Sequence, residues 1–427
     1  MSPEWMQGAA SPFSKVLVAN RGEIAVRVLQ AAREAGLSSV AVYSQSDSSS
    51  LHVETADESV LLEGGGLDET YLNGSAIIDA ARSTGADAIH PGYGFLSERA
   101  DFASAVEAAG MRWIGPSAHA IETMGDKISA RSLMIESGVP VIPGEQTPVE
   151  EGADHLGALA SAAAKVGYPL LIKASAGGGG KGMRSVSAPK NLRSEFEAAA
   201  REASSAFGDG TVYIERLLKR ARHVEIQVLC DTHGGAIHLN ERDCSLQRRY
   251  QKVIEEAPSP AVSPGMREAM GHAAVTAARS VGYVGAGTVE FLLASNGEFF
   301  FLEMNTRIQV EHPVTEMTTG IDLVQKQFEV AAGLPLGISQ DEVTQNGHSI
   351  EARVYAEDPS RGFLPSVGEL AVWKPPSGPG IRVDSGVREG DSVTIEFDPM
   401  LAKLIVHAPD RGSAIRRLDS ALSSFVV

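Results

Sequence analysis

The chain opens with alternating strand and helix patterns. A short apolar run (Lys15–Ala19) is followed by apolar residues at helical spacing (Ile24, Val28 and Ala31) and by a second apolar run (Ser39–Tyr43). Runs of this length indicate buried strands, and the spacing between them indicates a helix with one apolar face. The order predicts a βαβ unit that contributes two parallel strands to one sheet.

The alternation continues to about residue 124 as a helix, a strand and a helix, over residues 71–83, 88–90 and 102–109. We therefore expect a Rossmann-like N-terminal domain over residues 1–124. The first turn, Asn20–Glu23, lacks the G-x-G-x-x-G pattern of dinucleotide-binding folds, so Asp47 after the second strand is weak evidence for a ribose partner. We favour a scaffold that holds no nicotinamide dinucleotide.

The pattern changes twice more along the chain. A Pro- and Glu-rich stretch (Val141–Glu151) predicts a boundary loop that leads into a small subdomain at about 144–217. After residue 346, short strand-like runs dominate, namely Ser349–Tyr355, Leu370–Trp373, Val393–Glu396 and Leu401–His407. The sequence therefore predicts an α/β and α+β protein, with a central domain over 125–345 and a mainly β C-terminal domain over 346–427.

Composition narrows the class of protein. With 427 residues, the chain exceeds the size at which a single core stops growing, which agrees with several domains. The formal net charge of −17 argues against a nucleic-acid or anionic-membrane partner, since both bind positive surfaces. No stretch approaches the roughly 20 apolar residues that cross a bilayer. The cysteines, Cys230 and Cys244, lack the spacing of a disulfide framework or a structural zinc site. These features predict a soluble cytoplasmic protein.

A glycine-rich loop follows a predicted strand in the small subdomain. The apolar run Leu170–Lys173 leads into a segment with four consecutive glycines, Gly177–Gly180. Glycines let backbone N–H groups close around phosphate oxygens without obstruction from side chains. The segment is not a Walker A loop, because the required glycine and hydroxyl residue are absent at its two ends. A flexible hairpin tip is the alternative from this motif alone. Lys127 and Lys173 would supply positive charge to the phosphates.

A predicted hairpin brings two carboxylates together. Two apolar runs, Thr288–Ala294 and Glu298–Met304, flank the segment Ser295-Asn296-Gly297. Asn-Gly is the strongest short hairpin signal and predicts a two-residue type I′ turn. In that register Glu290 lies directly opposite Glu303.

Facing like charges destabilise a sheet unless something positive lies between them. Magnesium or manganese meets that need, because these cations prefer carboxylate oxygens and bridge ATP phosphates. Asn305 would emerge on the same face and add an oxygen. Phe299 and Phe301 would share this face, which indicates burial. Two relaxed glutamates on a solvent-facing edge are the alternative.

The segment Thr306–Pro313 alternates between polar and apolar residues. An extended chain would therefore direct Arg307, Gln309 and Glu311 to one side. Such a row can hold a small oxyanion with the arginine and remove its proton with the glutamate. An exposed alternating strand is the alternative when the segment is considered in isolation.

Together, these residues make the chain resemble the biotin carboxylase family of the ATP-grasp superfamily over essentially its whole length. The matching segments are His90–Glu98, Lys173–Met183, Arg222–Gln227, Gln247–Arg249 and Glu303–His312. The resemblance implies ATP-dependent carboxylation of carrier-bound biotin by bicarbonate, as the first half-reaction of an acyl-CoA carboxylase. It also implies that the glycine-rich subdomain is a mobile lid over the nucleotide.

The resemblance also implies the roles of individual residues. For ATP it implies Lys127, Lys173, Gly178, Gly179, Gly180, Met183, Glu215, Arg216, Leu218, His223, Gln247, Glu290 and Glu303. For two magnesium or manganese ions it implies Glu290, Glu303 and Asn305. For bicarbonate it implies Lys252, Arg307, Gln309, Val310 and the general base Glu311, and for biotin Tyr93 and Arg353.

The implied reaction has two stages. Glu311 deprotonates bicarbonate, which attacks the γ-phosphate of ATP to give carboxyphosphate. Carboxyphosphate releases carbon dioxide and phosphate, and the phosphate takes the ureido proton of biotin. Arg353 then stabilises the biotin enolate as a fixed cation.

Two residues depart from the family pattern. Tyr250 stands where the family often has His, and Arg216 stands where Lys is common. Both changes fall on the nucleotide side, so they put ribose and adenine contacts in doubt and leave the carboxylation chemistry intact. Two other functions are the alternatives: another ATP-grasp ligase that activates bicarbonate or a carboxylate, and a non-catalytic nucleotide-binding regulatory protein. The segment Arg307–Glu311 followed by Arg353 argues against the first alternative. The joint presence of Glu290, Glu303, Glu311 and Arg353 argues against the second.

The implied partners are a biotin carboxyl carrier, a carboxyltransferase subunit, and a second copy of the chain through the ATP-grasp and C-terminal regions. No Met-Lys dipeptide occurs, so the chain lacks the biotinylation motif of a carrier. The chain also ends on an apolar run, Ala421–Val427. We therefore expect the natural protein to continue beyond Val427, and dimerisation to be weakened in this chain. The final acyl acceptor is not determined by these residues.

Overall fold

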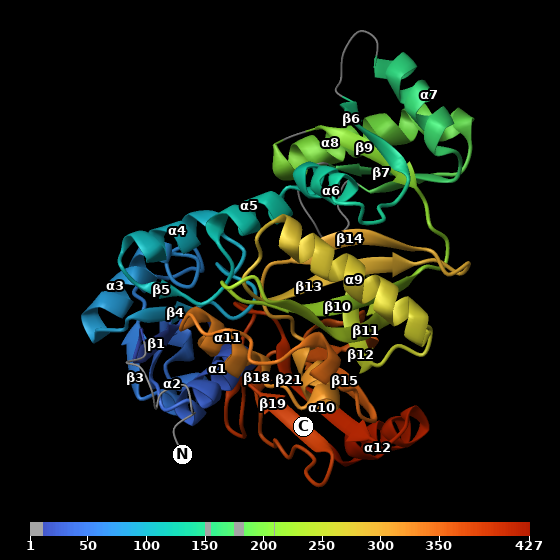
Figure 1. Cartoon of the computed structure of the whole chain (residues 1–427). Coiled ribbons are helices and arrows are strands. Elements are labelled where there is room, and N and C mark those ends of the chain that lie inside the picture. Colours follow the sequence, from blue (N-terminus) through green and yellow to red (C-terminus); the bar gives the residue numbers. More distant parts are fainter. Residues whose placement is uncertain (1–11, 150–154, 175–182, 209) are drawn as a thin grey trace.

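The computed structural model describes residues 12–149, 155–174, 183–208 and 210–427. Its N-terminal part is a parallel sheet of five strands in the order β3-β2-β1-β4-β5, flanked by helices (Figure 1). The strands are β1 (Lys15–Val18), β2 (Ser38–Tyr43), β3 (Glu58–Leu61), β4 (Ala88–His90) and β5 (Arg112–Trp113). The helices are α1 (Gly22–Glu34), α2 (Leu51–Thr55), α3 (Gly74–Thr84), α4 (Ala100–Ala108) and α5 (Ala118–Gly125). The predicted Rossmann-like fold is confirmed, although the largely exposed edge strand β3 was not predicted.

Helix α1 follows the predicted spacing. Ile24, Val28 and Ala31 are all buried in the core that this helix shares with the sheet. Near the start of the helix, Asp47 pairs with the guanidinium of Arg21 through two contacts of 2.7 Å, and it accepts a hydrogen bond of 2.6 Å from Tyr71. The carboxylate of Asp47 is therefore engaged inside the domain.

An antiparallel sheet of eight strands forms the centre of the molecule, in the order β14-β13-β10-β11-β12-β15-β21-β19 (Figure 1). Its strands are β10 (Arg222–Cys230), β11 (Ala236–Arg248), β12 (Gln251–Ala257), β13 (Gly285–Leu293), β14 (Phe299–Asn305), β15 (His348–Tyr355), β19 (Ile381–Ser385) and β21 (Met400–Ala408). Strands β12 and β15 pair with Glu255 opposite Glu351. The predicted boundary at residue 346 therefore runs through a continuous sheet.

Helices cover the central sheet. Helix α9 (Pro264–Ser280) packs on β10, β11 and β13, and α10 (His312–Thr319) packs on β11, β12, β15 and β21. Helix α11 (Leu323–Ala331) packs on α1 and β13. Along β10, Val224, Ile226 and Val228 belong to the apolar core beneath α9. His223 and Glu225 alternate with them and so point to the opposite face of the sheet, where α10 lies.

A separate antiparallel sheet of four strands, in the order β6-β9-β7-β8, lies above the central sheet in the view of Figure 1. Its elements are β6 (Gly144–Val149), β7 (Leu170–Ala174), β8 (Arg184–Val186), β9 (Val212–Arg216), α7 (His155–Val166) and α8 (Leu192–Phe207), with α6 (Lys127–Glu136) leading into it. The predicted boundary loop at Val141–Glu151 is wrong in part, because residues 144–149 form β6. The strand was missed because its sequence contains Gly and Pro, which usually indicate a loop.

The remaining C-terminal elements are two-residue strands and one helix of 14 residues. They are β16 (Glu357–Asp358), β17 (Leu364–Pro365), β18 (Gly368–Glu369), β20 (Ser392–Val393) and α12 (Arg411–Ser424). Single 3-10 turns occur at Gln45–Asp47, Pro189–Asn191, Gln340–Glu342 and Pro359–Arg361. The predicted strand at Leu370–Trp373 is wrong, because Leu370 and Trp373 instead fill a small apolar cluster with Leu401. The predicted strand at Val393–Glu396 keeps only its first residue in β20.

The last residues of the chain are only partly exposed. Ala421 is buried on α12, and the ring of Phe425 lies 5.0 Å from that of Trp373. Val426 and Val427 are exposed. Leu422 is exposed as well, so the apolar run at Ala421–Val427 is buried only in part.

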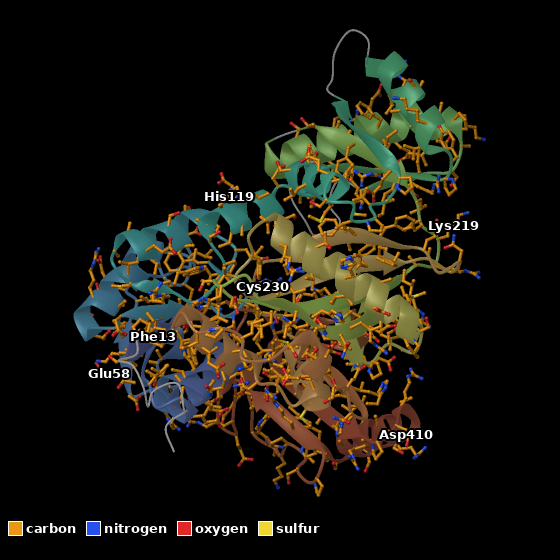
Figure 2. All side chains as sticks on the ribbon, viewed as in Figure 1. Phe13, Glu58, His119, Lys219, Cys230 and Asp410 are labelled. Atoms are coloured by element: carbon orange, nitrogen blue, oxygen red, sulfur yellow. The ribbon has the colours of Figure 1, made fainter. Side chains whose placement is uncertain are left out.

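The interior also holds the two thiols. Cys230 and Cys244 are both buried and carry no disulfide. Cys230 lies well inside the molecule, whereas Glu58 and Asp410 lie at its outside (Figure 2).

None of the described helices combines the length and apolarity that crossing a bilayer requires.

Buried ion pairs join the N-terminal helix to the C-terminal strands. Glu316 on α10 lies 3.0 Å from Arg27 on α1 and 2.7 Å from Arg382 on β19. Burial raises the pKa of Glu316, but Arg27 and Arg382 outweigh burial and hold that pKa below its ordinary value. This contribution to stability is present above the pKa of an unfolded glutamate and is lost as the pH falls through the lowered pKa of the folded state.

Replacing Glu316 with Gln should lower the free energy of unfolding by about 2 kcal/mol at neutral pH. Arg27 and Arg382 each lose one carboxylate partner and keep only Asp322 and Asp384. Chemical denaturation measures the difference, which should shrink at acidic pH. The control is Glu58→Gln, which breaks a half-exposed pair with Lys15 and should cost less than about 1 kcal/mol. Equal losses in the two variants would contradict the role of burial.

Candidate active site

A cavity of about 430 Å³ lies between the four-stranded sheet and the central sheet. Cavities of this size hold small-molecule ligands. It is lined by all the predicted nucleotide residues that the structure describes, namely Lys127, Lys173, Met183, Glu215, Arg216, Leu218, His223, Gln247, Glu290 and Glu303. The predicted phosphate residues Gly178, Gly179 and Gly180 lie outside the described residues. Tyr250 also lines the cavity and is 80% exposed.

Two lysines place positive charge at one end of this cavity. Lys173 on β7 forms an ion pair with Glu215 on β9. Burial lowers the pKa of Lys127, and Lys173 lowers it further, although Glu303 and Glu215 act in the opposite direction. The mutual repulsion of the two ammonium groups is relieved by added negative charge, which phosphate oxygens would provide.

The hairpin of β13 and β14 places Glu290 directly opposite Glu303, as predicted. The predicted two-residue turn is nevertheless wrong. The N–H of Ala294 donates to the carbonyl of Glu298 at 2.8 Å, so three residues form the turn. A bulge at Leu302 then shifts the register by one residue before the two glutamates. The two deviations cancel, which explains why the predicted pairing is correct.

The bulge also changes which residues share the glutamate face. Phe299 packs against Phe291, with ring centroids 5.4 Å apart, in the core beneath α9. Phe291 follows Glu290 along the strand and points to the opposite face, so the predicted place of Phe299 beside the glutamates is wrong. Phe301 lies opposite Phe291 and belongs to the same core, so its predicted place beside the glutamates is also wrong, although it contributes to the cavity wall. Glu303 is exposed at the cavity wall, and partial desolvation there together with the carboxylate of Glu290 raises its pKa.

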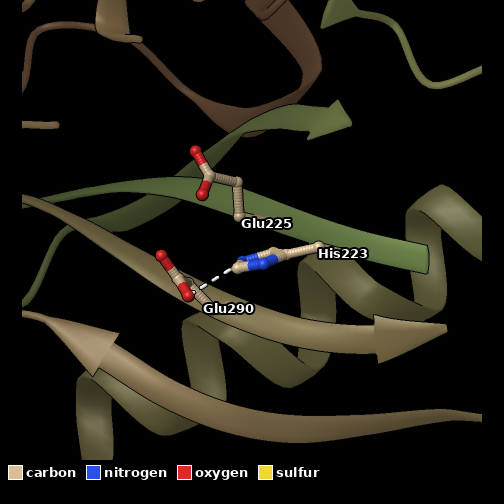
Figure 3. Close-up of side chains that lie close together, drawn as sticks. All are labelled: His223, Glu225 and Glu290. Carbon is tan, nitrogen blue, oxygen red and sulfur yellow. Dashed lines mark ion pairs between the residues drawn. The ribbon is translucent and has the colours of Figure 1, made fainter. Parts of the chain in front are cut away.

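His223 lies beside Glu290 on the neighbouring strand, with Nε2 of the imidazole 2.8 Å from the carboxylate (Figure 3). Burial lowers the pKa of His223, but Glu290 outweighs burial and raises that pKa above its ordinary value. The other ring nitrogen lies 3.1 Å from the side-chain amide of Gln247. Glu225 shares this face of the sheet (Figure 3). An imidazole and an amide therefore stand beside the carboxylate that was predicted to hold metal.

The ammonium group of Lys252 lies between three buried carboxylates. Its Nζ is 2.6 Å from Glu225, 2.8 Å from Glu290 and 2.7 Å from Glu311. Burial alone would lower the pKa of Lys252, but the three carboxylates raise it well above the ordinary value. Lys252 therefore stays charged and joins the cavity, through Glu290, to Glu311.

The acids of this face suit a hard divalent cation. Glu290 and Glu303 offer carboxylate oxygens from opposed positions, and oxygen is the ligand that Mg²⁺ prefers. A cation between them would also relieve the repulsion that raises the pKa of Glu303. The ligand atoms of His223, Glu225 and Glu290 lie within 4.8 Å of one another. The acidic residues at this end of the cavity thus fit the predicted metal.

The segment after β14 is not the extended strand that was predicted. Strand β14 ends at Asn305, and Glu311 is already the N-cap residue of α10, with φ −83° and ψ 12°. Pro313 stands in the first turn of this helix, where its fixed φ is favourable. The helix start therefore ends the alternation before Glu311.

The side chains of this segment still converge. Arg307 donates to Gln309 at 2.9 Å and to Glu98 at 2.9 Å, and Gln309 donates to Glu290 at 3.1 Å. The amide nitrogen of Asn305 donates to Glu290 at 2.9 Å, while its oxygen accepts from Arg307 at 3.0 Å. An oxygen ligand from Asn305 would therefore require the amide to turn over.

Glu311 is fully buried and held by two cations. In addition to Lys252, Arg353 lies 3.1 Å from its carboxylate. Burial raises the pKa of Glu311, but Lys252 and Arg353 outweigh burial and hold it well below the usual range. The carboxylate is ionised at neutral pH, as a proton acceptor must be. Arg353 also donates to Glu255 at 2.7 Å, which fixes the plane of the guanidinium.

The N-terminal domain reaches this site through Tyr93. The hydroxyl of Tyr93 donates to Glu23 at the start of α1. Burial raises the pKa of Tyr93 well above its ordinary value, and Glu23 adds to this, whereas the charge of Arg353 acts in the opposite direction. The carbonyl of Val310 accepts a hydrogen bond of 2.8 Å from Lys403 on β21. The site is therefore assembled from all three regions of the chain.

Several residues of the site were not predicted. Glu98 lies inside the matched segment His90–Glu98, and Glu225 lies two residues from His223 on one strand, so a signal existed for both. Glu255 shows no pattern of its own. Arg242 is fully buried and donates to Glu225 at 2.6 Å, and nothing in its sequence neighbourhood indicates this.

Family models match almost the whole chain. The model for the biotin carboxylase N-terminal domain matches residues 12–121, and that for the biotin carboxylase C-terminal domain matches residues 351–427. The model for the carbamoyl-phosphate synthase L chain ATP binding domain matches residues 126–339.

Curated relatives are similar over 97% of the chain. It is 52% identical over 416 residues to the mitochondrial methylcrotonoyl-CoA carboxylase subunit alpha of Dictyostelium discoideum, and spans 59% of that protein's length. It is 50% identical over 416 residues to biotin carboxylase 1 of Bacillus subtilis, of which it covers 92%. The chain thus spans less than two thirds of the first of these relatives and nearly all of the second.

Solved structures agree with the relatives. A biotin carboxylase from Campylobacter jejuni, crystallised with β,γ-ATP, superimposes with a TM-score of 0.92 at 44% identity, over 97% of this chain and 92% of that one. The biotin carboxylase domain dimer of Hydrogenobacter thermophilus 2-oxoglutarate carboxylase, in complex with MgADP, ADP and bicarbonate, gives 0.91 at 46%, over 97% and 90%. On its sequence, its fold and the residues that line its cavity, the chain belongs to the biotin carboxylase family.

Proposed function

We propose that this chain carboxylates biotin on a carrier protein, using ATP and bicarbonate and releasing ADP and phosphate. The observation that carries the proposal is the position of Lys252, which joins the cavity at Glu290 to the buried base Glu311. Arg353, on the other side of Glu311, supplies a second cation. A nucleotide site and an acid–base site therefore share one set of charges.

In the first stage, Lys252 and Arg307 hold bicarbonate, with Gln309 and the backbone of Val310 beside it. Glu311 accepts the bicarbonate proton, and the resulting oxygen attacks the γ-phosphorus. The bond from that phosphorus to the ADP oxygen breaks, which gives carboxyphosphate. Lys127 and Lys173 stabilise the charge of the phosphate chain during the transfer.

The divalent cation would be held by Glu290 and Glu303 and would neutralise phosphate charge when bound. The MgADP bound to the Hydrogenobacter thermophilus domain supports magnesium here. Manganese and a second ion are proposed on the same acidic residues. Asn305 would join them after its amide turns over.

In the second stage, carboxyphosphate separates into carbon dioxide and phosphate. The phosphate takes the proton from the ureido nitrogen of biotin, and that nitrogen forms the new bond to carbon dioxide. Arg353 stabilises the negative oxygen that develops on the ureido group. Tyr93 packs beside the biotin ring.

The proposed partners follow from the relatives. A biotinylated carrier and a carboxyltransferase subunit would complete the reaction, as in an acyl-CoA carboxylase. A homodimer is supported by the biotin carboxylase domain dimer of Hydrogenobacter thermophilus. A cytoplasmic location stays a prediction, because some relatives are named as mitochondrial proteins. The three domains at 1–124, 125–345 and 346–427, with a lid at 144–217, also stay predictions.

The proposal is tested by following ADP release from the purified chain with ATP and Mg²⁺. ADP release should require bicarbonate and should rise when free biotin or a biotinylated carrier is added. ATP cleavage that is indifferent to bicarbonate would refute the proposal. Bicarbonate-dependent cleavage that biotin never stimulates would favour another bicarbonate-activating ligase.

Replacing Glu303 with Gln should reduce kcat by about 100-fold at saturating Mg²⁺, because a cation ligand is lost. The midpoint of thermal unfolding should not fall, since the change also removes the repulsion with Glu290. The control is Glu298→Gln, on the exposed turn of the same hairpin, which should keep wild-type kcat. An unchanged kcat in Glu303→Gln would disprove the metal role.

Replacing Arg353 with Ala should lower the rate of biotin carboxylation by about 100-fold, because the cation for the ureido oxygen is gone. The KM for ATP should stay within about twofold of wild type. Arg267→Ala removes an ion pair between a half-buried arginine and the buried Glu241, outside the site, and should keep the carboxylation rate. If Arg353→Ala weakens ATP affinity as much as carboxylation, the division between the two stages is wrong.

A further inference from the structure

Lys403 on β21 is a fully buried lysine that no step of the proposed reaction uses. Its Nζ donates to the carbonyl of Val310 at 2.8 Å. The same ammonium lies 3.1 Å from a carboxylate oxygen of Glu23 and 3.8 Å from Asp384. Lys403 therefore connects the C-terminal strands, the start of α1 and the turn at Val310 through one atom.

A second side chain holds the neighbouring carbonyl of that turn. Nδ1 of His312 lies 2.7 Å from the carbonyl of Gln309, and both residues are buried. Burial lowers the pKa of His312 well below its ordinary value, so the neutral ring donates through Nδ1. Two successive carbonyls, of Gln309 and Val310, are thus each fixed by a buried donor.

Fixing these carbonyls also orients the N–H groups that follow them. A trans peptide group is planar, so its N–H points opposite to its carbonyl. The N–H groups of Val310 and Glu311 therefore point away from His312 and Lys403. Successive backbone N–H groups held in this way are donors that proteins use for small oxyanions. The carbonyl of Val310 and the N–H of Glu311 belong to one peptide group, so the hydrogen bond from Lys403 to this carbonyl also fixes the direction of the N–H of Glu311.

The ion pair with Glu23 extends the connection to the biotin side. The other oxygen of Glu23 accepts from Tyr93, so one carboxylate bridges Tyr93 and Lys403. A buried ion pair adds little to stability compared with an apolar pair of similar volume. Lys403 donates a hydrogen bond to the carbonyl of Val310, which an apolar side chain could not do.

We propose that Lys403 is a positioning residue for the bicarbonate-binding turn, acting through the carbonyl of Val310 and anchored by Glu23. The inference rests on the proposed function, because it assigns the turn at Gln309–Glu311 to bicarbonate. Lys403 touches no reacting atom. Its effect is on the orientation of the backbone donors that bicarbonate meets.

The test is Lys403→Met, which keeps the length of the side chain and removes the donor. The KM for bicarbonate in ADP release should rise about tenfold, as expected for a lost charge-assisted hydrogen bond, and the KM for ATP should change by less than about twofold. The matched control is Lys326→Met, because Lys326 also donates to a carbonyl, of Leu336, and to a carboxylate, of Glu329, on α11 outside the site. This control should leave both KM values unchanged.

A second variant covers a failure of Lys403→Met to fold. Glu23→Gln keeps the shape of the side chain and weakens the anchor of Lys403, so it should raise the KM for bicarbonate severalfold. In the double variant with Lys403→Met the two effects should be less than additive, since both act through one contact. A wild-type KM for bicarbonate in either folded variant overturns the inference. Absence of bicarbonate-dependent ADP release in the wild-type chain overturns the proposed function instead.

Discussion

The arrangement of the site depends on one buried ammonium group. The Nζ atom of Lys252 lies 2.6 Å from Glu225, 2.8 Å from Glu290 and 2.7 Å from Glu311, so one positive charge offsets the repulsion among three buried carboxylates. Arg242 supports the same arrangement by binding Glu225 from the other side at 2.6 Å. Lys252 contacts both Glu290 and Glu311. A change of charge beside Glu290 therefore changes the electrostatic potential at the carboxylate of Glu311.

The central sheet explains how such distant parts of the sequence meet. Lys252 and Glu255 lie on β12, and β12 pairs directly with β15, which carries Arg353. Strand β21 pairs with β15 in turn, with Lys403 opposite Arg353. Lys252, Arg353 and Lys403 therefore lie on three adjacent strands, at spacings that the ladder of hydrogen bonds sets.

Much of the fold and of the candidate site could be predicted from the sequence. The βαβ order, the opposition of Glu290 and Glu303, and the grouping of the cavity residues all came from patterns or from the resemblance. The details of backbone geometry did not, because a bulge at Leu302 and a helix start at His312 leave no trace in the alternation of apolar and polar residues. The partners Arg242 and Lys403 were missed for another reason. A buried cation looks like any surface lysine or arginine until its strand neighbours are known, since its carboxylates come from other elements.

The two sheets that enclose the cavity differ in how they are joined. Among the described residues, an isolated bridge between Val141 and Phe301 is the only strand-type link between the four-stranded sheet and the central one. A rotation near that bridge would therefore change the width of the cavity lined by Lys127 and Lys173 without breaking a ladder of paired strands. The spacing between Lys252 on β12 and Arg353 on β15 has no such freedom, because the pairing of these two strands would have to come apart. Strand pairing therefore sets the distance between Lys252 and Arg353, whereas it leaves the width of the cavity unset.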